Sequence, residues 1–310
     1  MEQQVRDVFI TVLNVAGNLV VSLAFKADDT VEQVKLSIQK AIAVPPFRQR
    51  LTVGTSIVND SVAVGDLLPQ PLQLTLVILD CIPEVGAVLF SAVERANEAG
   101  AESALWALAD PNHVDPSTRT PLFVAARNGN AELVSLLCNA RADANKAKQT
   151  GMTPLYVAAQ NGHTSVVQCL HSHGADPDRT DKYGATPLLV ASQNGLVDIV
   201  RFLCAQAVDV DKARQSGATP LCIASQHGHS EVVCCLIEAG ADINRGKHSG
   251  ETPLYVAAQG AHVEVVRQLC ESRADPDVPD ESGSTAMAIA SWRGHMPVLD
   301  VLQQHCQGLG

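Results

Sequence analysis

Aromatic residues, long apolar runs and basic charge are all scarce in this sequence of 310 residues. Phe, Tyr and Trp make up 4% of it although 46% is hydrophobic, so a core must be packed from small aliphatic side chains. Lys and Arg number 22 against 33 Asp and Glu, and the net charge of -11 argues against nucleic-acid binding, because affinity for phosphates needs a concentrated excess of cations.

Segments that would send the chain to or through a membrane are also missing. No stretch of about 18 uncharged apolar residues occurs, and the first residues lack the basic and long apolar parts of a secretory signal. We therefore expect an intracellular protein, cytoplasmic or also nuclear, with no membrane partner. Its length is sufficient for two folded units.

The nine cysteines lack the spacing of a metal or redox site, since none forms a CxxC pair. Seven lie within or beside apolar runs, and Cys138, Cys204 and Cys270 share one phase of a repeat. This spacing predicts small core residues on equivalent helices in a reducing compartment.

What the sequence does have is one segment repeated at a period of 33 residues without insertion. Its copies include "GMTPLYVAAQNG" from Gly151 and "GATPLLVASQNG" from Gly184. The phase is marked by six threonines: Thr120, Thr153, Thr186, Thr219, Thr252 and Thr285. Threonine suits a helix N-cap, and the Pro that follows five of them suits the first helical position. A small pair, a glycine and a second apolar helix follow, which predicts a solenoid of helix pairs.

These motifs resemble the ankyrin repeat, with its G-x-T-P-L start, N-G-H turn and G-A-D-x-N end. The resemblance implies about six repeats over residues 115–310, each closed by a polar β-hairpin finger, and a degenerate capping repeat after a linker within residues 81–119. Thr118 and Ala261 replace expected glycines, Val208 replaces an alanine, and Ala286 replaces the proline of the last repeat, which suggests a terminal cap.

Residues 1–80 have a different pattern. The predicted order of elements is ββαβ…β. It begins with two segments of alternating apolar and polar residues around a turn at residues 16–18, followed by an amphipathic helix that runs through Ile42 and is stopped by Pro45, and then by two later strands. Asp29 or Thr30, followed by Glu32, suits the helix N-cap. With "DDTVEQVKLSIQ" and "LQLTLVIL", this order resembles ubiquitin-like domains.

The whole chain is thus expected to be an α+β ubiquitin-like β-grasp domain followed by an all-α ankyrin solenoid with β-hairpin fingers. Thr52 and Thr75 stand where ubiquitin has aliphatic residues of its main binding patch, and the chain continues past "VILDCIPEVG" in place of a free diglycine end. The resemblance therefore implies docking and not conjugation. A folded appendage without a role in the ubiquitin pathway is the alternative.

Catalytic chemistry is not indicated. His163, His229, His262 and His295 share one phase, but successive repeats move a position by about 10 Å, too far for one metal ion, so hydrogen bonding near the turn between helices is expected. No phosphate-binding, zinc-protease or nucleophile motif occurs. We predict no enzyme activity, no catalytic residue, no metal and no cofactor.

Partner contacts are expected, by resemblance, at finger tips and at the exposed ends of the first helices. One row in the fingers is basic and recurs at the 33-residue period: Lys146, Arg179, Lys212 and Arg245. It would attract an acidic segment of a partner, or it is only a solvated surface. The other candidates are Arg127, Gln149, Met152, Gln160, Lys182, Tyr183, Gln193, Gln215, Gln226, Lys247, His248, Trp292 and Arg293. Large exposed side chains such as Tyr183 would be binding hot spots, although Trp292 would equally suit a covered cap core.

The expected function is a non-enzymatic, monomeric adaptor or scaffold. The ankyrin surface would bind one protein, with acidic segments, and the ubiquitin-like domain would dock a second, such as a protein of the ubiquitin-proteasome pathway. The alternatives are a structural scaffold that masks or inhibits a partner, or the regulatory part of a larger enzyme or channel.

Overall fold

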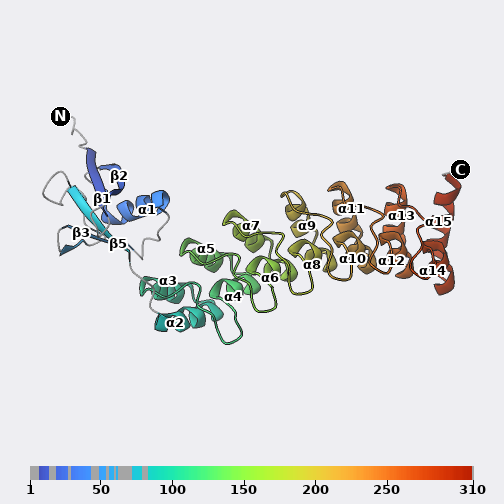
Figure 1. Cartoon of the computed structure of the whole chain (residues 1–310), viewed down its shortest axis with the longest axis horizontal. Coiled ribbons are helices and arrows are strands. Elements are labelled where there is room, and N and C mark those ends of the chain that lie inside the picture. Colours follow the sequence, from blue (N-terminus) through green and yellow to red (C-terminus); the bar gives the residue numbers. More distant parts are fainter. Residues whose placement is uncertain are drawn as a thin grey trace. The chain divides into compact units, whose positions relative to one another are not determined.

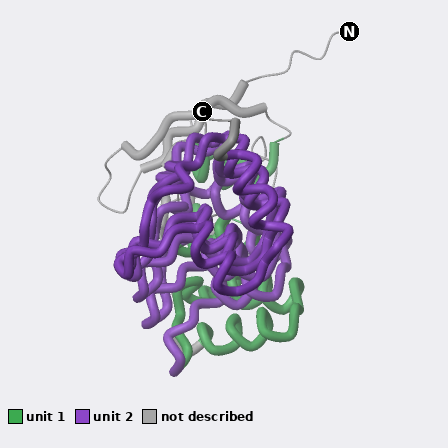
Figure 2. The backbone as a smooth tube through the Cα atoms, turned by 90° about the vertical axis from the view of Figure 1, so that its right-hand side faces the viewer, with its two compact units in different colours: residues 1–115, 136–143 green, residues 116–135, 144–310 purple. Residues whose placement is uncertain are grey.

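The computed structural model describes residues 7–13, 19–26, 29–42, 49–53, 56–58, 61, 72–78 and 83–308. Contacts divide the chain into two compact units, residues 1–115 with 136–143 and residues 116–135 with 144–310 (Figure 2). The strands described lie in the first unit, and the second unit is built from paired helices.

The first unit contains a five-stranded sheet in the order β2-β1-β5-β3-β4. Its strands are β1 (Asp7–Leu13), β2 (Leu19–Lys26), β3 (Gln49–Val53), β4 (Ser56–Ile57) and β5 (Leu72–Ile78). β1 pairs antiparallel with β2 and parallel with β5, which pairs antiparallel with β3. In that last pair Thr52 lies opposite Thr75. The strand and helix order is the expected one, while membership of the ubiquitin-like family stays a prediction.

Helix α1 (Val31–Ile42) lies between β2 and β3 in the chain and buries Val31, Val34 and Ile38, the apolar face that its periodicity predicts. Its start differs in detail from the expected one. Gln33, not Glu32, completes the cap: its side-chain Oε1 accepts from the Thr30 backbone N–H at 2.6 Å, and the Thr30 hydroxyl accepts from Gln33 N–H at 3.4 Å. A neutral amide therefore fills the role assigned to a carboxylate. The expected turn at 16–18 and Pro45 lie outside the described residues.

Two helices follow in the same unit, α2 (Pro83–Glu94) and α3 (Glu98–Trp106), and they pack against each other. Ala96 and Leu108 have positive φ angles of 52° and 66°, and they lie 33 residues before Gly129 and Arg141, which have φ angles of 78° and 71°. The backbone period thus begins before Thr120. The domain boundaries at 81, 115 and 119 stay predictions.

In the second unit the first helices of successive repeats form an inner row, in which each helix contacts the next (Figure 1). They are α4 (Pro121–Asn128), α6 (Pro154–Asn161), α8 (Pro187–Gln193), α10 (Pro220–His227), α12 (Pro253–Gln259) and α14 (Ala286–Arg293). The second helices form an outer row: α7 (Thr164–Ser172), α9 (Val197–Cys204), α11 (Ser230–Glu238), α13 (Val263–Glu271) and α15 (Met296–Gly308). Helix α5 (Ala131–Asn139) belongs to the same series but is divided between the two units.

The six threonines start the inner helices as predicted. Each is an extended N-cap whose side chain accepts from the backbone N–H three residues on, as Thr186 does from Leu189 at 3.1 Å. Many of the inner helices end at a residue in the left-handed conformation. Ala261 stands where other repeats have a glycine, and it keeps this conformation with φ 57°. Because a cap satisfies a free N–H group, the short helices α4, α6, α8, α10 and α12 can be buried on most of their surface.

The fingers, named 1 to 5, are residues 143–152, 176–185, 209–218, 242–251 and 275–284. No strand lies among these residues, so the expected β-hairpins are not confirmed. In finger 1 the Lys148 N–H donates to the Met152 carbonyl at 2.9 Å and the Gly151 N–H to the Lys148 carbonyl at 2.8 Å, with Gly151 at φ 82°. This tight turn is too short for a strand ladder.

Candidate partner-binding surface

Neighbouring fingers are joined through their backbones. At the tips, the Lys182 N–H donates to the Thr150 carbonyl at 2.9 Å, the Gln215 N–H to the Tyr183 carbonyl at 2.8 Å, and the His248 N–H to the Ser216 carbonyl at 3.1 Å. Main-chain bonds of this kind do not depend on which side chain stands at the tip. The tip side chains are therefore free to vary without loss of the link between fingers.

The predicted contact residues are accessible to different degrees. Twelve are exposed: Arg127, Gln149, Gln160, Arg179, Lys182, Tyr183, Gln215, Gln226, Arg245, His248, Trp292 and Arg293. Five are half-buried: Lys146, Met152, Gln193, Lys212 and Lys247. The exposed majority is compatible with partner binding, and their role as contacts stays a prediction.

The basic row takes part in the fold. Arg179 Nη1 donates to the Asn145 carbonyl at 2.9 Å, and Lys212 Nζ donates to the Asp178 carbonyl at 2.8 Å. Both bonds reach the preceding finger, 34 residues earlier. In fingers 2 and 3 a cation at this position thus bonds to the preceding finger, which gives it a structural role there without a partner.

We call the residue 28 positions after each repeat's threonine the finger base, which is Asp181 in finger 2. A second contact, at this position, was not anticipated from the sequence. The Tyr156 hydroxyl donates to Asp181 Oδ2 at 3.3 Å, while Asp181 Oδ1 accepts from the N–H groups of Tyr183 and Ala185, both at 2.9 Å. Burial, and then the Asp181 carboxylate, raises the pKa of Tyr156. In the fifth repeat burial, and then Asp280, raises the pKa of Tyr255 in the same way.

In the fourth repeat the end of the inner helix contacts the finger base. Lys247 Nζ lies 3.0 Å from Gln226 Oε1 and 3.2 Å from Glu251 Oε2. Gln226 stands seven residues after its threonine, in the same phase as Arg127 and Trp292. The ends of the inner helices, together with the bases and tips of the fingers, make up one surface, which we call the finger face.

Two aromatic side chains project from the finger face. Tyr183 is 57% exposed with Lys182 Nζ 4.8 Å from its ring centroid, and Trp292 is 80% exposed with the Arg293 guanidinium 5.8 Å from its ring. Trp292 therefore does not cover a cap core. Large aromatic side chains in such positions bury much area on binding at little cost in conformational entropy.

The phased histidines form hydrogen bonds near the turn between helices, as the sequence predicts, and these bonds also join adjacent repeats. Nε2 of His229 lies 2.9 Å from the Gln193 carbonyl, and Nε2 of His163 lies 3.1 Å from the Arg127 carbonyl. A carbonyl only accepts, so Nε2 carries the hydrogen. Within the described ranges no group of three or more His, Cys, Asp or Glu side chains is placed to hold a metal ion. Cys138 and Cys270 are buried as expected, while Cys204 is half-buried.

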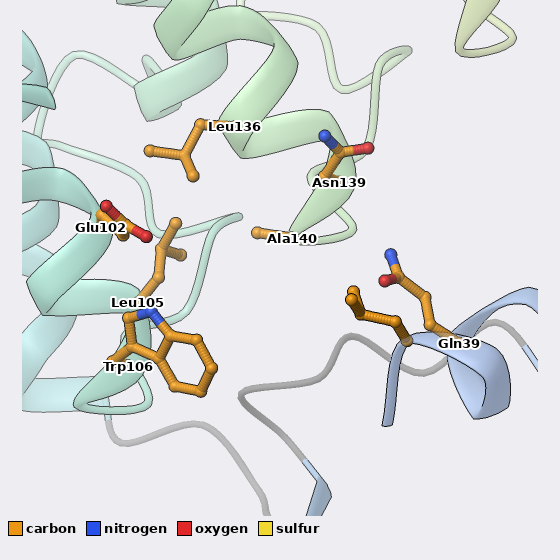
Figure 3. Close-up of a pocket in the computed structure, with 8 residues that line it drawn as sticks. Gln39, Glu102, Leu105, Trp106, Leu136, Asn139 and Ala140 are labelled. Carbon is orange, nitrogen blue, oxygen red and sulfur yellow. The ribbon is translucent and has the colours of Figure 1, made fainter. Parts of the chain in front are cut away.

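The first unit has an apolar pocket of about 350 Å³ (Figure 3). Leu105, Trp106 and Leu136 line it together with Leu36 of α1, and Glu102 is among its polar residues. Trp106 is 47% exposed and Leu36 44%. Apolar surface is therefore open to solvent in this unit as well as on the finger face.

The fold and the surface define a repeat scaffold with a constant helical core and a variable exposed face. A family model of three ankyrin-repeat copies matches residues 89–181 and again 158–247, and a model of many copies matches residues 236–290. Because these matches span more than half of the chain, the protein belongs to the ankyrin-repeat family. Ankyrin arrays are protein-interaction modules, and protein binding is the general role that this membership supports.

One solved structure supports the fold independently. The crystal structure of the ankyrin repeat domain of Bcl-3, described as a unique member of the IkappaB protein family, is similar with a TM-score of 0.63 and 24% identity. The similarity covers 70% of this chain and 97% of that one, and at this identity it concerns the fold alone. Among curated proteins none matches. None of the described helices has both the length and the apolar character to cross a membrane.

Proposed function

We propose that this protein is a non-enzymatic, monomeric adaptor whose finger face binds one protein, including an acidic segment of it, while the N-terminal domain of residues 1–80 docks a second. The observation that carries the proposal is the backbone linkage of the finger tips, which leaves side chains such as Tyr183 exposed and free to differ between repeats. The surface needs no cofactor or metal for this role.

The second docking partner is proposed from the resemblance of residues 1–80 to ubiquitin-like domains, and a protein of the ubiquitin-proteasome pathway is the expected class. Thr52 and Thr75 are paired neighbours on β3 and β5, at the positions where ubiquitin has aliphatic contact residues. Recognition by a receptor that requires an aliphatic patch there is not expected. The adaptor would act in the cytoplasm, and also in the nucleus.

The test is partner identification by chemical crosslinking in cell extract with four forms of the protein. These are the whole chain, residues 81–310, the whole chain with Tyr183→Ala and Trp292→Ala, and the whole chain with Arg201→Ala as a matched control on the outer helix α9. An adaptor loses one set of partners with the first 80 residues and a different set with the double variant.

The same experiment separates the alternatives. A masking scaffold would lose its single partner with the double variant and nothing with the truncation, and the regulatory part of an enzyme would recover one catalytic protein through either region. Recovery of the same proteins by all four forms would refute the proposed role of both surfaces.

A further inference from the structure

The finger base changes charge from one repeat to another in step with the inner helix beneath it. In fingers 1 to 5 the base residue, 28 positions after each threonine, is respectively Lys148, Asp181, Arg214, Lys247 and Asp280. In the inner helices of the same five repeats, the residue three positions after the threonine is respectively Phe123, Tyr156, Leu189, Cys222 and Tyr255. An aspartate therefore stands only where a tyrosine lies below it, and a cation stands above each side chain without a phenol.

The aspartate of finger 2 does not present a free carboxylate to a partner. Asp181 receives three hydrogen bonds, from the Tyr156 hydroxyl and from the N–H groups of Tyr183 and Ala185. These bonds occupy most of the acceptor sites of the carboxylate, which number about four. Besides Arg179 of the basic row, this finger has a cation one residue after the aspartate, Lys182, which is exposed beside the Tyr183 ring.

Among the described residues, fingers 4 and 5 do not offer, at or beside the base residue, a cation free of a carboxylate partner, as the first three fingers do. In finger 4 the Lys247 ammonium is paired with Glu251 at 3.2 Å, and its side chain is only 15% exposed. Finger 5 contains Asp275, Asp277, Asp280 and Glu281 and no Lys or Arg. In finger 3, by contrast, Arg214 Nε donates to the neutral Ser216 hydroxyl at 2.9 Å, so its charge is not neutralised by this contact.

We propose that fingers 1 to 3 bind an extended acidic segment of a protein partner, with one carboxylate facing each of Lys148, Lys182 and Arg214. Packed helices lie about 8–10 Å apart, and an extended chain in the polyproline II conformation advances about 3.1 Å per residue with three residues per turn. Acidic residues that face successive fingers should therefore recur at every third position. Arg127, exposed at the end of α4, adds a cation at one end of this surface. The inference rests on the proposed function and specifies its partner.

An acidic peptide fits these cations better than a nucleic acid does. The three cations come one to a repeat, and Asp143, Asp176 and Asp209 stand in the same fingers. Affinity for a phosphate backbone requires a dense and continuous run of cations, whereas spaced carboxylates can be matched one by one.

The test is selection from a phage-displayed library of random peptides of about 12 residues, long enough to cross three repeats when extended. Whole chains are used as bait: wild type, the triple variant Lys148→Gln, Lys182→Gln and Arg214→Gln, and Arg201→Gln as control. We expect wild type and control to enrich peptides with Asp or Glu at every third position, and the triple variant to lose that enrichment. Enrichment without acidic periodicity, or its retention by the triple variant, would overturn the proposal.

A selected peptide then gives the size of each contribution by fluorescence polarisation. Exposed charge pairs are individually weak, so each single Gln substitution should reduce affinity about twofold to fivefold, and added salt should reduce it further. Unchanged melting temperatures show that the variants are folded. Equal competition by a single-stranded oligonucleotide would identify a general polyanion surface and refute the peptide assignment.

Failure of this inference can be told from failure of the adaptor model. If the triple variant keeps the crosslinked partners of wild type while Tyr183→Ala with Trp292→Ala loses them, the acidic segment is wrong and the finger face remains the binding surface. If neither variant changes the partners, the finger face itself is wrong.

Discussion

The inner helices and the fingers share one period but are joined to their neighbours by different kinds of contact. Inner helices touch through side chains, and in α4, α6, α8, α10 and α12 the first six residues are all buried. Finger tips touch through backbone hydrogen bonds, although other finger positions also bond through side chains, as Arg179 does to the Asn145 carbonyl. Side-chain packing constrains residue identity, whereas a main-chain link does not, so variation that recognises partners can accumulate at the tips without loss of that link.

The largest effect is expected where the inner row is interrupted. Ala191 is fully buried within α8, and Ala191→Pro would remove a helical N–H and place the ring against the preceding turn. We expect a loss of about 3 kcal/mol or more and unfolding of the middle repeats, because each repeat is stabilised by its neighbours. Circular dichroism and thermal melting measure it.

The matched control is the same substitution at the start of the last inner helix. Ala286 follows the extended N-cap Thr285, in the place that proline takes in the five preceding repeats. Ala286→Pro should leave the fold intact and add up to about 1 kcal/mol, because it restricts the unfolded chain. Unchanged melting of Ala191→Pro, or equal damage from both, would contradict the packing model.

A smaller effect is expected at the helix ends. Gly195 has φ 70°, and a Cβ built on it would lie 2.7 Å from His229 Nδ1. Gly195→Ala should therefore lose about 1–2 kcal/mol from the left-handed conformation alone, and more from the collision. The reverse change Ala261→Gly removes the strain of an alanine at φ 57° and should stabilise the protein. The gain is reduced by the greater conformational entropy of glycine in the unfolded chain. Urea unfolding of both variants is the measurement, and a gain in the first or a loss in the second would be inconsistent.

Most of the inner row could be predicted from the sequence because its signals are local. Thr186 with Pro187 marks a helix start whatever lies nearby, and the 33-residue spacing of such pairs indicates stacked units. The cap of α1 shows the limit of local reasoning. Thr30 was one of two candidates, and the choice of Gln33 over Glu32 as its partner depends on side-chain positions that the pattern does not determine.

The finger contacts were harder to foresee because they join residues far apart in the chain. Tyr156 and Asp181 are 25 residues apart, and the basic row bonds to carbonyls 34 residues earlier. A signal was present, since Tyr recurs with Asp at fixed phases in the second and fifth repeats. Comparing variation between repeats, and not only what they share, would have found the pair.

The tyrosine contact predicts a dependence of stability on alkaline pH. Since the pKa of Tyr156 is raised in the folded state, the folded protein holds this proton more tightly, and the associated stability is complete below about pH 10 and is lost above it. Tyr156→Phe should lose about 1 kcal/mol at neutral pH through the hydrogen bond to Asp181, and less at high pH. Urea unfolding at neutral and alkaline pH measures this. Leu189→Phe, in the same phase without a phenol, serves as control, and an equal pH dependence in wild type and Tyr156→Phe would refute the contact.

The smallest effect comes from variation inside the inner row itself. Ser192 and Ser225 are both fully buried and 33 residues apart, but Ser192 Oγ donates to the Leu188 carbonyl at 2.8 Å, whereas Ser225 Oγ has no hydrogen-bond partner among the described residues. An unsatisfied buried hydroxyl is destabilising and alanine favours the helix, so Ser225→Ala should gain about 1 kcal/mol. Ser192→Ala should change stability little, because the lost bond offsets the better propensity. Melting temperatures of the two variants decide the matter. If both shift alike, hydroxyl bonding does not distinguish the repeats, and the inner row tolerates polar variation as freely as the fingers do.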